Sequence, residues 1–204
     1  ETGYDLEVLS NDINLFIEEL NLKNIIIMGQ SMGAEVSIIT SLKNKNIKGC
    51  IAIDGGVINL KNKFENKQEC LESLKPPNLN GVKKEKILSM LKQSHADWSK
   101  KAIMGQFSIF DVDDEDKVIK RLELKNHLKL LESLWDNDSL ENLKLLKVPA
   151  LFILVNFEID LNNFDHDKIK FEVEKLIGDH DIHAQKPEIV SKIIKERLSR
   201  KFFG

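Results

Sequence analysis

A serine between two glycines is the residue of this chain with the clearest chemical potential. The segment NIIIMGQSMGAEVSIITSL, residues 24–42, passes from a β-branched apolar run through GQSMG into an amphipathic stretch, with Ser31 at the centre of GQSMG. A serine at the tip of a tight strand-to-helix turn exposes its hydroxyl, which attacks a carbonyl carbon when a base removes its proton. The following helix points its first backbone N–H groups at an oxyanion that forms nearby.

Small residues beside the serine make such a turn possible. A Cβ atom at Gly29 or Gly33 is expected to clash with the adjoining strand and helix, and Ser31 is expected in a strained backbone conformation. Two other interpretations of the turn are open: a glycine-rich turn with an incidental serine, and a phosphate-binding turn. The phosphate-binding interpretation lacks G-x-G-x-x-G, a Walker lysine and an acidic residue placed for a ribose.

A serine nucleophile also needs a base and a carboxylate that orients the base. Two of the five histidines, His180 and His183, fall in the segment GDHDIHAQKP just before the predicted last helix. For the carboxylate, Asp160 is the first choice and Glu158 the second. Both follow a predicted strand at its carboxyl end, where open α/β sheets place their sites. Asp54, which follows an earlier strand, is the third choice.

Alternating helices and apolar strands must position these residues. The predicted elements are helices over residues 5–20, 32–42 and 187–203, and strands over residues 24–28, 48–53 and 148–155. The strand segments are continuous apolar runs, which is typical of strands buried on both faces of a parallel sheet. The alternation predicts an α/β fold.

Residues 58–147 differ from the rest because they are polar and show helical patterns without a clear strand. The predicted helices within them cover residues 83–93, 97–106, 115–134 and 139–146, with turns at PPN and NG. This pattern predicts a helical insertion between two strands of the sheet. The expected organisation is therefore a core over residues 1–57, an insertion over 58–147, and a second part of the core over 148–204.

Composition and charge exclude some classes of partner. The formal net charge of −3 over 204 residues provides no attraction toward nucleic acid or anionic lipid. No apolar run approaches the ~20 residues of a membrane span, and no signal peptide opens the chain. Two cysteines, Cys50 and Cys70, do not make a disulfide framework, so a reducing compartment, the cytoplasm, is expected. Nothing in the sequence predicts an oligomeric state.

Four segments together resemble the α/β-hydrolase family: NIIIMGQSMGAEV, GCIAIDGG, VPALFILV and GDHDIHAQKPEIV. The resemblance covers the carboxyl-terminal two-thirds of that family's fold. It implies a mostly parallel sheet with a helical lid formed by the insertion. It also implies hydrolysis of a small-molecule ester, amide or similar carbonyl substrate by a Ser-His-acid triad, with no metal and no organic cofactor.

The resemblance implies a role for each residue of the turn. Ser31 is the nucleophile, the backbone N–H of Met32 contributes to the oxyanion hole, and Gly29, Gln30 and Gly33 form the elbow. The serine, the acid and the histidine then follow one another in the chain order of α/β-hydrolases.

The histidine segment matches the family's pattern G-x-H-x-x-H-x-x-x-P-E. In that pattern the first histidine is the catalytic one, which implies His180 as the base and His183 as a neighbour that lines the pocket. The lid is expected to cover the site and to set the shape of the substrate. The candidates to line its pocket, each of which is otherwise part of the lid core, are Trp98, Met104, Phe107, Phe110 and Trp135.

The sequence departs from the family's pattern in two places. The family's earlier strands, and the loop that supplies a second oxyanion N–H, have no counterpart here. Residues 161–167 are too short for a parallel crossover, so residues 168–177 are expected to form a crossover helix or an antiparallel edge strand. The first departure leaves a second hypothesis open: an inactive fragment, or a non-catalytic binding remnant of the fold.

Overall fold

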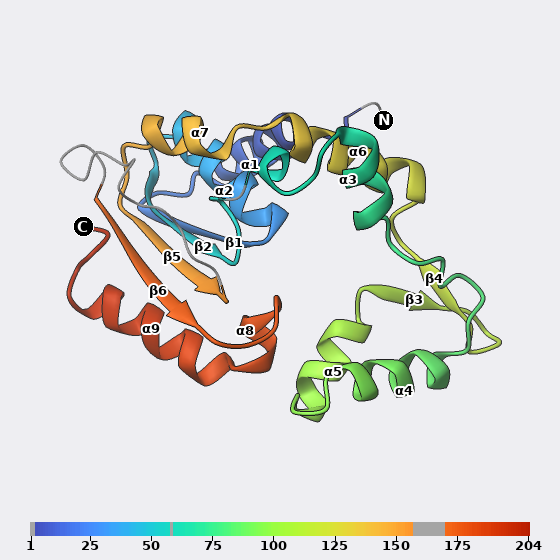
Figure 1. Ribbon diagram of the computed structural model, residues 1–204. Coiled ribbons are helices and arrows are strands. Elements are labelled where there is room, and N and C mark those ends of the chain that lie inside the picture. The colour runs from blue at the N-terminus through green and yellow to red at the C-terminus, as the bar shows by residue number, and fades with distance from the viewer. Residues whose placement is uncertain (1–2, 58, 157–169) are drawn as a thin grey trace.

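Four parallel strands in the order β1-β2-β5-β6 form the centre of the structure (Figure 1). The computed structural model describes residues 3–57, 59–156 and 170–204. The strands are β1 (Ile25–Gln30), β2 (Ile47–Ile53), β5 (Ala150–Val155) and β6 (Phe171–Leu176). Each neighbouring pair is parallel. The predicted α/β fold with a mostly parallel sheet is confirmed.

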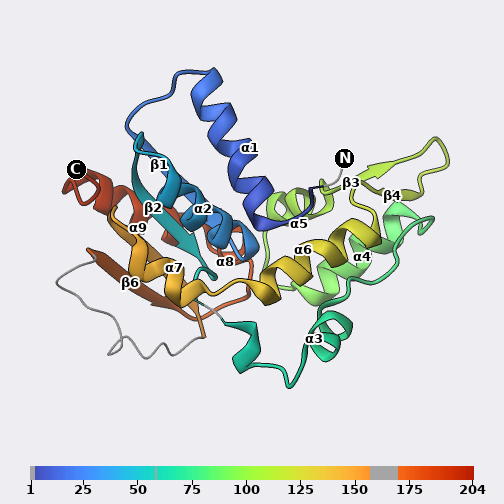
Figure 2. The ribbon, with the colours of Figure 1, turned by 90° about the horizontal axis from the view of Figure 1, so that it is seen from above.

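Helices cover both faces of this sheet (Figures 1 and 2). One face carries α1 (Leu6–Glu19), α2 (Met32–Lys43) and α7 (Ser139–Leu145), and the other carries α9 (Pro187–Ser199). The short helix α8 (Ile182–Gln185) precedes α9 and lies near the carboxyl ends of the strands. No helix of the described residues is long and apolar enough to cross a membrane.

The two central strands are buried on both faces, as their apolar runs predict. Successive side chains of a strand point to opposite faces, so each strand contributes to two clusters. The side chains on the α2 and α7 side are Cys50, Ala52, Ala150, Phe152 and Leu154. Those on the α9 side are Ile51, Ile53, Leu151, Ile153 and Val155.

Strand β1 is more exposed than its apolar run predicts. The run IIIM indicates burial on both faces, but the Met28 side chain is 55% exposed and the other residues of β1 are only half-buried. The physical reason is position, since within the described residues β1 pairs with β2 alone and forms an edge of the sheet.

The prediction for residues 168–177 was wrong. They contain β6, which is parallel to β5 with Ala150 opposite Phe171. The connection comprises residues 156–170 and not only 161–167, which exceeds the dozen residues that a parallel crossover needs. Arg197 of α9 further fixes the strand by ion pairs with Glu172 and Glu174.

The insertion between β2 and β5 is largely helical. Its elements are η1 (Leu60–Asn62), α3 (Lys67–Leu74), α4 (Lys84–Ser94), α5 (Lys100–Phe107), β3 (Phe110–Val112), β4 (Val118–Lys120) and α6 (Leu124–Asp136), followed by α7. In Figure 1 the group formed by α4, α5, β3 and β4 projects away from the sheet, beyond α3 and α6.

The antiparallel ribbon β3–β4 was not predicted, and it corrects the predicted helix over residues 115–134, which begins only at Leu124. Tertiary contacts hold residues 118–120 extended in spite of the helical pattern that follows. The backbone N–H of Val118 donates to the carbonyl of Val82, and its own carbonyl accepts from Gly81. The Val118 side chain is buried against Ile87.

A buried carboxyl group connects α2 to the start of α7. Glu35 is 2% exposed and accepts hydrogen bonds from the Ser139 hydroxyl at 2.7 Å and the Asn137 amide at 3.0 Å. Burial raises the pKa of Glu35 from 4.5 to about 7, although these hydrogen bonds act in the opposite direction.

We expect Glu35 to make the stability of the fold depend on pH. The folded state binds the proton of Glu35 more tightly than the unfolded state, so the free energy of unfolding falls as pH rises from 4.5 to about 7. The loss is about 3 kcal/mol. The variant Glu35→Gln, which cannot ionise, should lose most of this dependence, whereas exposed Glu18→Gln should keep it. Urea unfolding at pH 5 and pH 8 measures the difference, and equal dependence in both variants contradicts the prediction.

Candidate active site

Ser31 occupies the turn between β1 and α2. Its φ of 53° lies in the left-handed region that residues other than glycine rarely adopt. Its backbone N–H donates to the carbonyl of Ile53 on β2 at 2.9 Å, and its own carbonyl accepts from Ala34 at 3.0 Å. These bonds hold a strained turn at the carboxyl end of β1, in the strand–turn–helix setting that the sequence predicts.

Two glycines give the turn its space, and only one of them, Gly29, is among the two that the sequence indicates. A Cβ atom on Gly29 would lie 1.9 Å from the carbonyl oxygen of Gly33, so no larger residue fits there. A Cβ atom on Gly33 would meet nothing within 4 Å, which corrects the prediction for that position. The second close approach is at Gly55, where a Cβ atom would lie 2.3 Å from the Ser31 carbonyl oxygen.

Asp54 and His180 form a hydrogen-bonded pair beside this turn. The distance between His180 Nδ1 and Asp54 Oδ2 is 2.6 Å. The other oxygen, Asp54 Oδ1, accepts the backbone N–H of Val155 at 2.9 Å, and the Asp54 N–H donates to Ile153. The Asp54 carboxylate is therefore fixed at the carboxyl ends of β2 and β5 and has little freedom to reorient.

Asp54 makes protonation of the His180 ring more favourable. The hydrogen bond with Asp54 raises the pKa of His180 above its usual 6.5, and partial burial acts against it. The negative charges of Asp54 and Asp181 raise that pKa further. Because a carboxylate accepts a proton at Nδ1, the neutral ring keeps Nε2 free as a base.

In the structure His180 pairs with Asp54, the third choice for the acid. Asp160 and Glu158, the first and second choices, lie outside the described residues, so both stay predictions. The rule that favoured them, a carboxylate at the carboxyl end of a strand, applies equally to Asp54. With Asp54 as the acid, the chain order serine, acid, histidine is unchanged.

Other residues of the predicted site lie close to these groups. Met32 begins α2, so its N–H has no acceptor within the helix, as an oxyanion donor requires. The side-chain amide of Gln30 donates to the His180 carbonyl at 3.2 Å. Within the part of the chain that the structure describes, the Ser31 hydroxyl forms no hydrogen bond. No group of three or more metal-ligating side chains lies together among the described residues.

A family comparison fits this geometry. The model of the family described as "BAAT / Acyl-CoA thioester hydrolase C terminal" matches residues 5–122, more than half of the chain. The chain belongs to this family. The match covers β1, the Ser31 turn, α2, β2 and most of the insertion.

Solved structures confirm the α/β-hydrolase fold. E-2-(acetamidomethylene)succinate hydrolase has a TM-score of 0.73 at 17% identity, over 97% of this chain and 75% of that one. The peroxisomal α/β-hydrolase Lpx1 of Saccharomyces cerevisiae has a TM-score of 0.74 at 12% identity, over 99% and 61%. An esterase of Exiguobacterium antarcticum has a TM-score of 0.64 at 16% identity, over 97% and 75%.

A curated relative adds a shorter match. Ethanol acetyltransferase 1 of Hanseniaspora uvarum is 39% identical over 56 residues, which are 27% of this chain. The match covers only 17% of that enzyme, so this chain spans a small part of its length.

The insertion of this family member contacts the histidine segment directly. The Asp179 carboxylate, next to His180, accepts from Trp98 Nε1 at 2.7 Å and lies 3.1 Å from His95 Nδ1. The rings of His95 and Trp98 stack with their centroids 4.1 Å apart. These bonds hold the pKa of Asp179 below its usual value. Trp98, a predicted pocket residue, therefore connects the insertion to the loop that carries His180.

The other predicted pocket residues lie on several elements. Phe107 is buried in a cluster of the insertion with Ile87 and Val118, whereas Met104 on α5 is 42% exposed. Trp135 is partly buried on α6. His183 is exposed and lines a hollow between β1 and α9. Their roles in binding a substrate stay predictions.

The glycines of the turn give a matched prediction. Gly29→Ala should lower the free energy of unfolding by several kcal/mol or prevent folding, because its Cβ atom would overlap a backbone carbonyl. Gly33→Ala should change it by about 1 kcal/mol or less, because the site is open and alanine favours a helix. Urea denaturation of both variants tests this, and similar losses in the two would contradict it.

The Asp54–His180 pair gives a second prediction. Asp54→Asn removes the interaction that contributes most to the raised pKa of His180, so that pKa should fall. Asp160→Asn and Glu158→Gln serve as comparisons, because they test the acids that the sequence favours. The proton resonances of the His180 ring, titrated by NMR in each variant, give the answer. A pKa that falls only in the Asp160 or Glu158 variant would refute the assignment of Asp54.

Proposed function

We propose that this protein is a serine hydrolase that cleaves an ester, thioester or amide bond of a small carbonyl substrate. The observation that carries the proposal is the Asp54–His180 pair, 2.6 Å apart, beside a strained serine turn at the same edge of the sheet. Membership of the acyl-CoA thioester hydrolase family supports the same class of reaction.

The residues support a two-step acyl transfer. In the first step Ser31 Oγ attacks the carbonyl carbon while His180 Nε2 takes the hydroxyl proton, and the oxyanion faces the N–H of Met32. Asp54 orients the ring and stabilises the imidazolium that forms. His180 then returns the proton to the leaving group, which departs and leaves an acyl group on Ser31.

The second step repeats the first with water in place of the serine. His180 takes a proton from a water molecule that attacks the acyl-enzyme carbonyl. The tetrahedral intermediate then collapses with cleavage of the bond to Ser31 Oγ, which receives the proton from His180, and a carboxylic acid is released. Both steps consume only the substrate and water.

A second candidate function is acyl transfer to an alcohol. It is favoured by the match to Ethanol acetyltransferase 1. It uses the same acyl-enzyme and differs only in the acceptor that attacks it. Turnover of an acetate ester in the presence of ethanol separates the two, because hydrolysis yields acetate and transfer yields ethyl acetate.

Labelling with a fluorophosphonate probe tests the nucleophile. The wild-type protein should be labelled and should hydrolyse an activated ester, and Ser31→Ala should lose both by several orders of magnitude. Ser199→Ala, an exposed position on α9, should behave as wild type. Labelling that survives in Ser31→Ala would refute the proposal. A folded wild-type protein that is not labelled would favour the non-catalytic remnant.

A further inference from the structure

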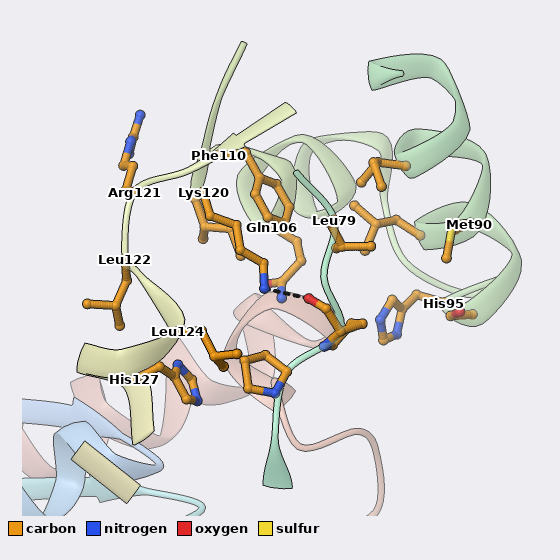
Figure 3. A pocket seen from close by; sticks show the side chains of 16 residues that line it. Leu79, Met90, His95, Gln106, Phe110, Lys120, Arg121, Leu122, Leu124 and His127 are labelled. Carbon is orange, nitrogen blue, oxygen red and sulfur yellow. Dashed lines mark hydrogen bonds between the residues drawn. The ribbon is translucent and has the colours of Figure 1, made fainter. Parts of the chain in front are cut away.

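The insertion contains a cavity of about 480 Å³ that is lined only by its own residues, from Pro76 to His127 (Figure 3). It lies among α4, α5, the β3–β4 ribbon and the start of α6. Ser31, Asp54 and His180 do not line it, so it is separate from the proposed catalytic groups. Its volume lies in the range of ~300–1,000 Å³ that is typical of small-molecule sites.

Most of the cavity wall is apolar. Its apolar lining includes Ile87 and Leu91 on α4, Phe110 on β3, and Leu79 in the segment before α4. Met90 also lines the cavity and is 45% exposed, so it lies where the cavity meets solvent. A wall of this kind favours a hydrocarbon chain, which gains free energy when it leaves water.

One uncompensated positive charge points into this apolar space. Figure 3 shows the Lys120 ammonium group inside the cavity, hydrogen-bonded to the backbone carbonyl of Pro77. Among the described residues, no carboxylate pairs with Lys120, and no Asp or Glu lines the cavity. Arg121 points away from the cavity in Figure 3 and pairs with Asp111 at 2.8 Å, so its charge is compensated.

The groups near Lys120 are neutral hydrogen-bonding side chains. His127 lines the same end of the cavity, and burial, followed by the charge of Lys120, lowers the pKa of His127 below 6.5. The ring is therefore uncharged at neutral pH. Gln106 also lines the cavity and adds an amide. The polar end thus offers a single positive charge with neutral polar groups, which complements one anionic group.

We propose that this cavity is a binding site for an apolar monocarboxylate of the fatty-acid class. The carboxylate lies on Lys120, and the hydrocarbon chain lies against Leu79, Ile87 and Leu91. The proposal goes beyond hydrolysis, because it depends on residues of the insertion alone and holds whether or not Ser31 reacts.

The fluorescence of Trp98 can report binding in the cavity. His95 lines the cavity and stacks on Trp98, so a ligand that reaches His95 alters the surroundings of the indole ring. The fluorescence of Trp98 should therefore change on binding, and Trp98→Phe identifies that part of the signal.

Decanoate is a suitable probe, with 1-decanol as an uncharged ligand of the same chain length. Calorimetric titration of the intact protein should show that decanoate binds more tightly than decanol. Lys120→Met should weaken decanoate binding about tenfold or more, the size expected for loss of one charged hydrogen bond, and should leave decanol binding unchanged. Lys117→Met is the matched control, because Lys117 directly precedes β4, pairs with Glu115 and does not line the cavity.

The proposal would be overturned by no decanoate binding by the folded wild-type protein, by equal affinity for decanoate and decanol, or by unchanged decanoate affinity in Lys120→Met. A further variant tests whether the ligand binds in the cavity. Met90→Trp fills the opening at a partly exposed position and should weaken the binding of both decanoate and decanol. Unchanged affinity for both would mean that they bind elsewhere and would likewise overturn the proposal. Ser31→Ala should bind decanoate as wild type does, which separates this proposal from the proposed hydrolysis.

Discussion

The candidate site depends on the two oxygens of one carboxylate. Asp54 Oδ1 is bound by the backbone of β5 and Oδ2 by the ring of His180, while the peptide group on its amino side belongs to β2. A histidine on a loop has many orientations, and one strong hydrogen bond from a fixed acceptor removes most of them. The side-chain amide of Gln30, which reaches the His180 backbone from the Ser31 turn, adds a second restraint.

Neighbouring residues of the histidine segment face different partners. His180 contacts the carboxylate of the sheet, whereas Asp179 contacts His95 and Trp98 of the insertion. Gln185 strengthens the second contact, because its side chain bonds both to the Asp179 backbone and to Asp97. The insertion is thus held at its tip by the histidine segment and at its base by the buried Glu35.

The sequence predicts those parts of the structure that depend on local pattern. Continuous apolar runs identify β2 and β5, and the pattern around Ser31 identifies its turn. The exposure of β1, the parallel direction of β6 and the extended backbone at Val118 depend on which segments lie side by side, and a single sequence does not record this. The Asp54–His180 contact is a case of the same kind, since several strand ends carry a carboxylate and only the fold shows which one the histidine reaches. The partnership of Asp179 with Trp98 had no signal in the sequence.

The place of the insertion also bears on how the chain folds. Strands β2 and β5 are neighbours in the sheet, with Cys50 opposite Ala150, yet the whole of the insertion lies between them in the chain. Closing so long a loop costs entropy before the strand pair returns any stability. Contacts of short range, such as α1 on α2 and α4 on α5, face a smaller cost and form faster. We therefore expect the pairing that sets Asp54 beside Val155 to form late in folding, and the Asp54 carboxylate to reach its position only after the insertion has collapsed.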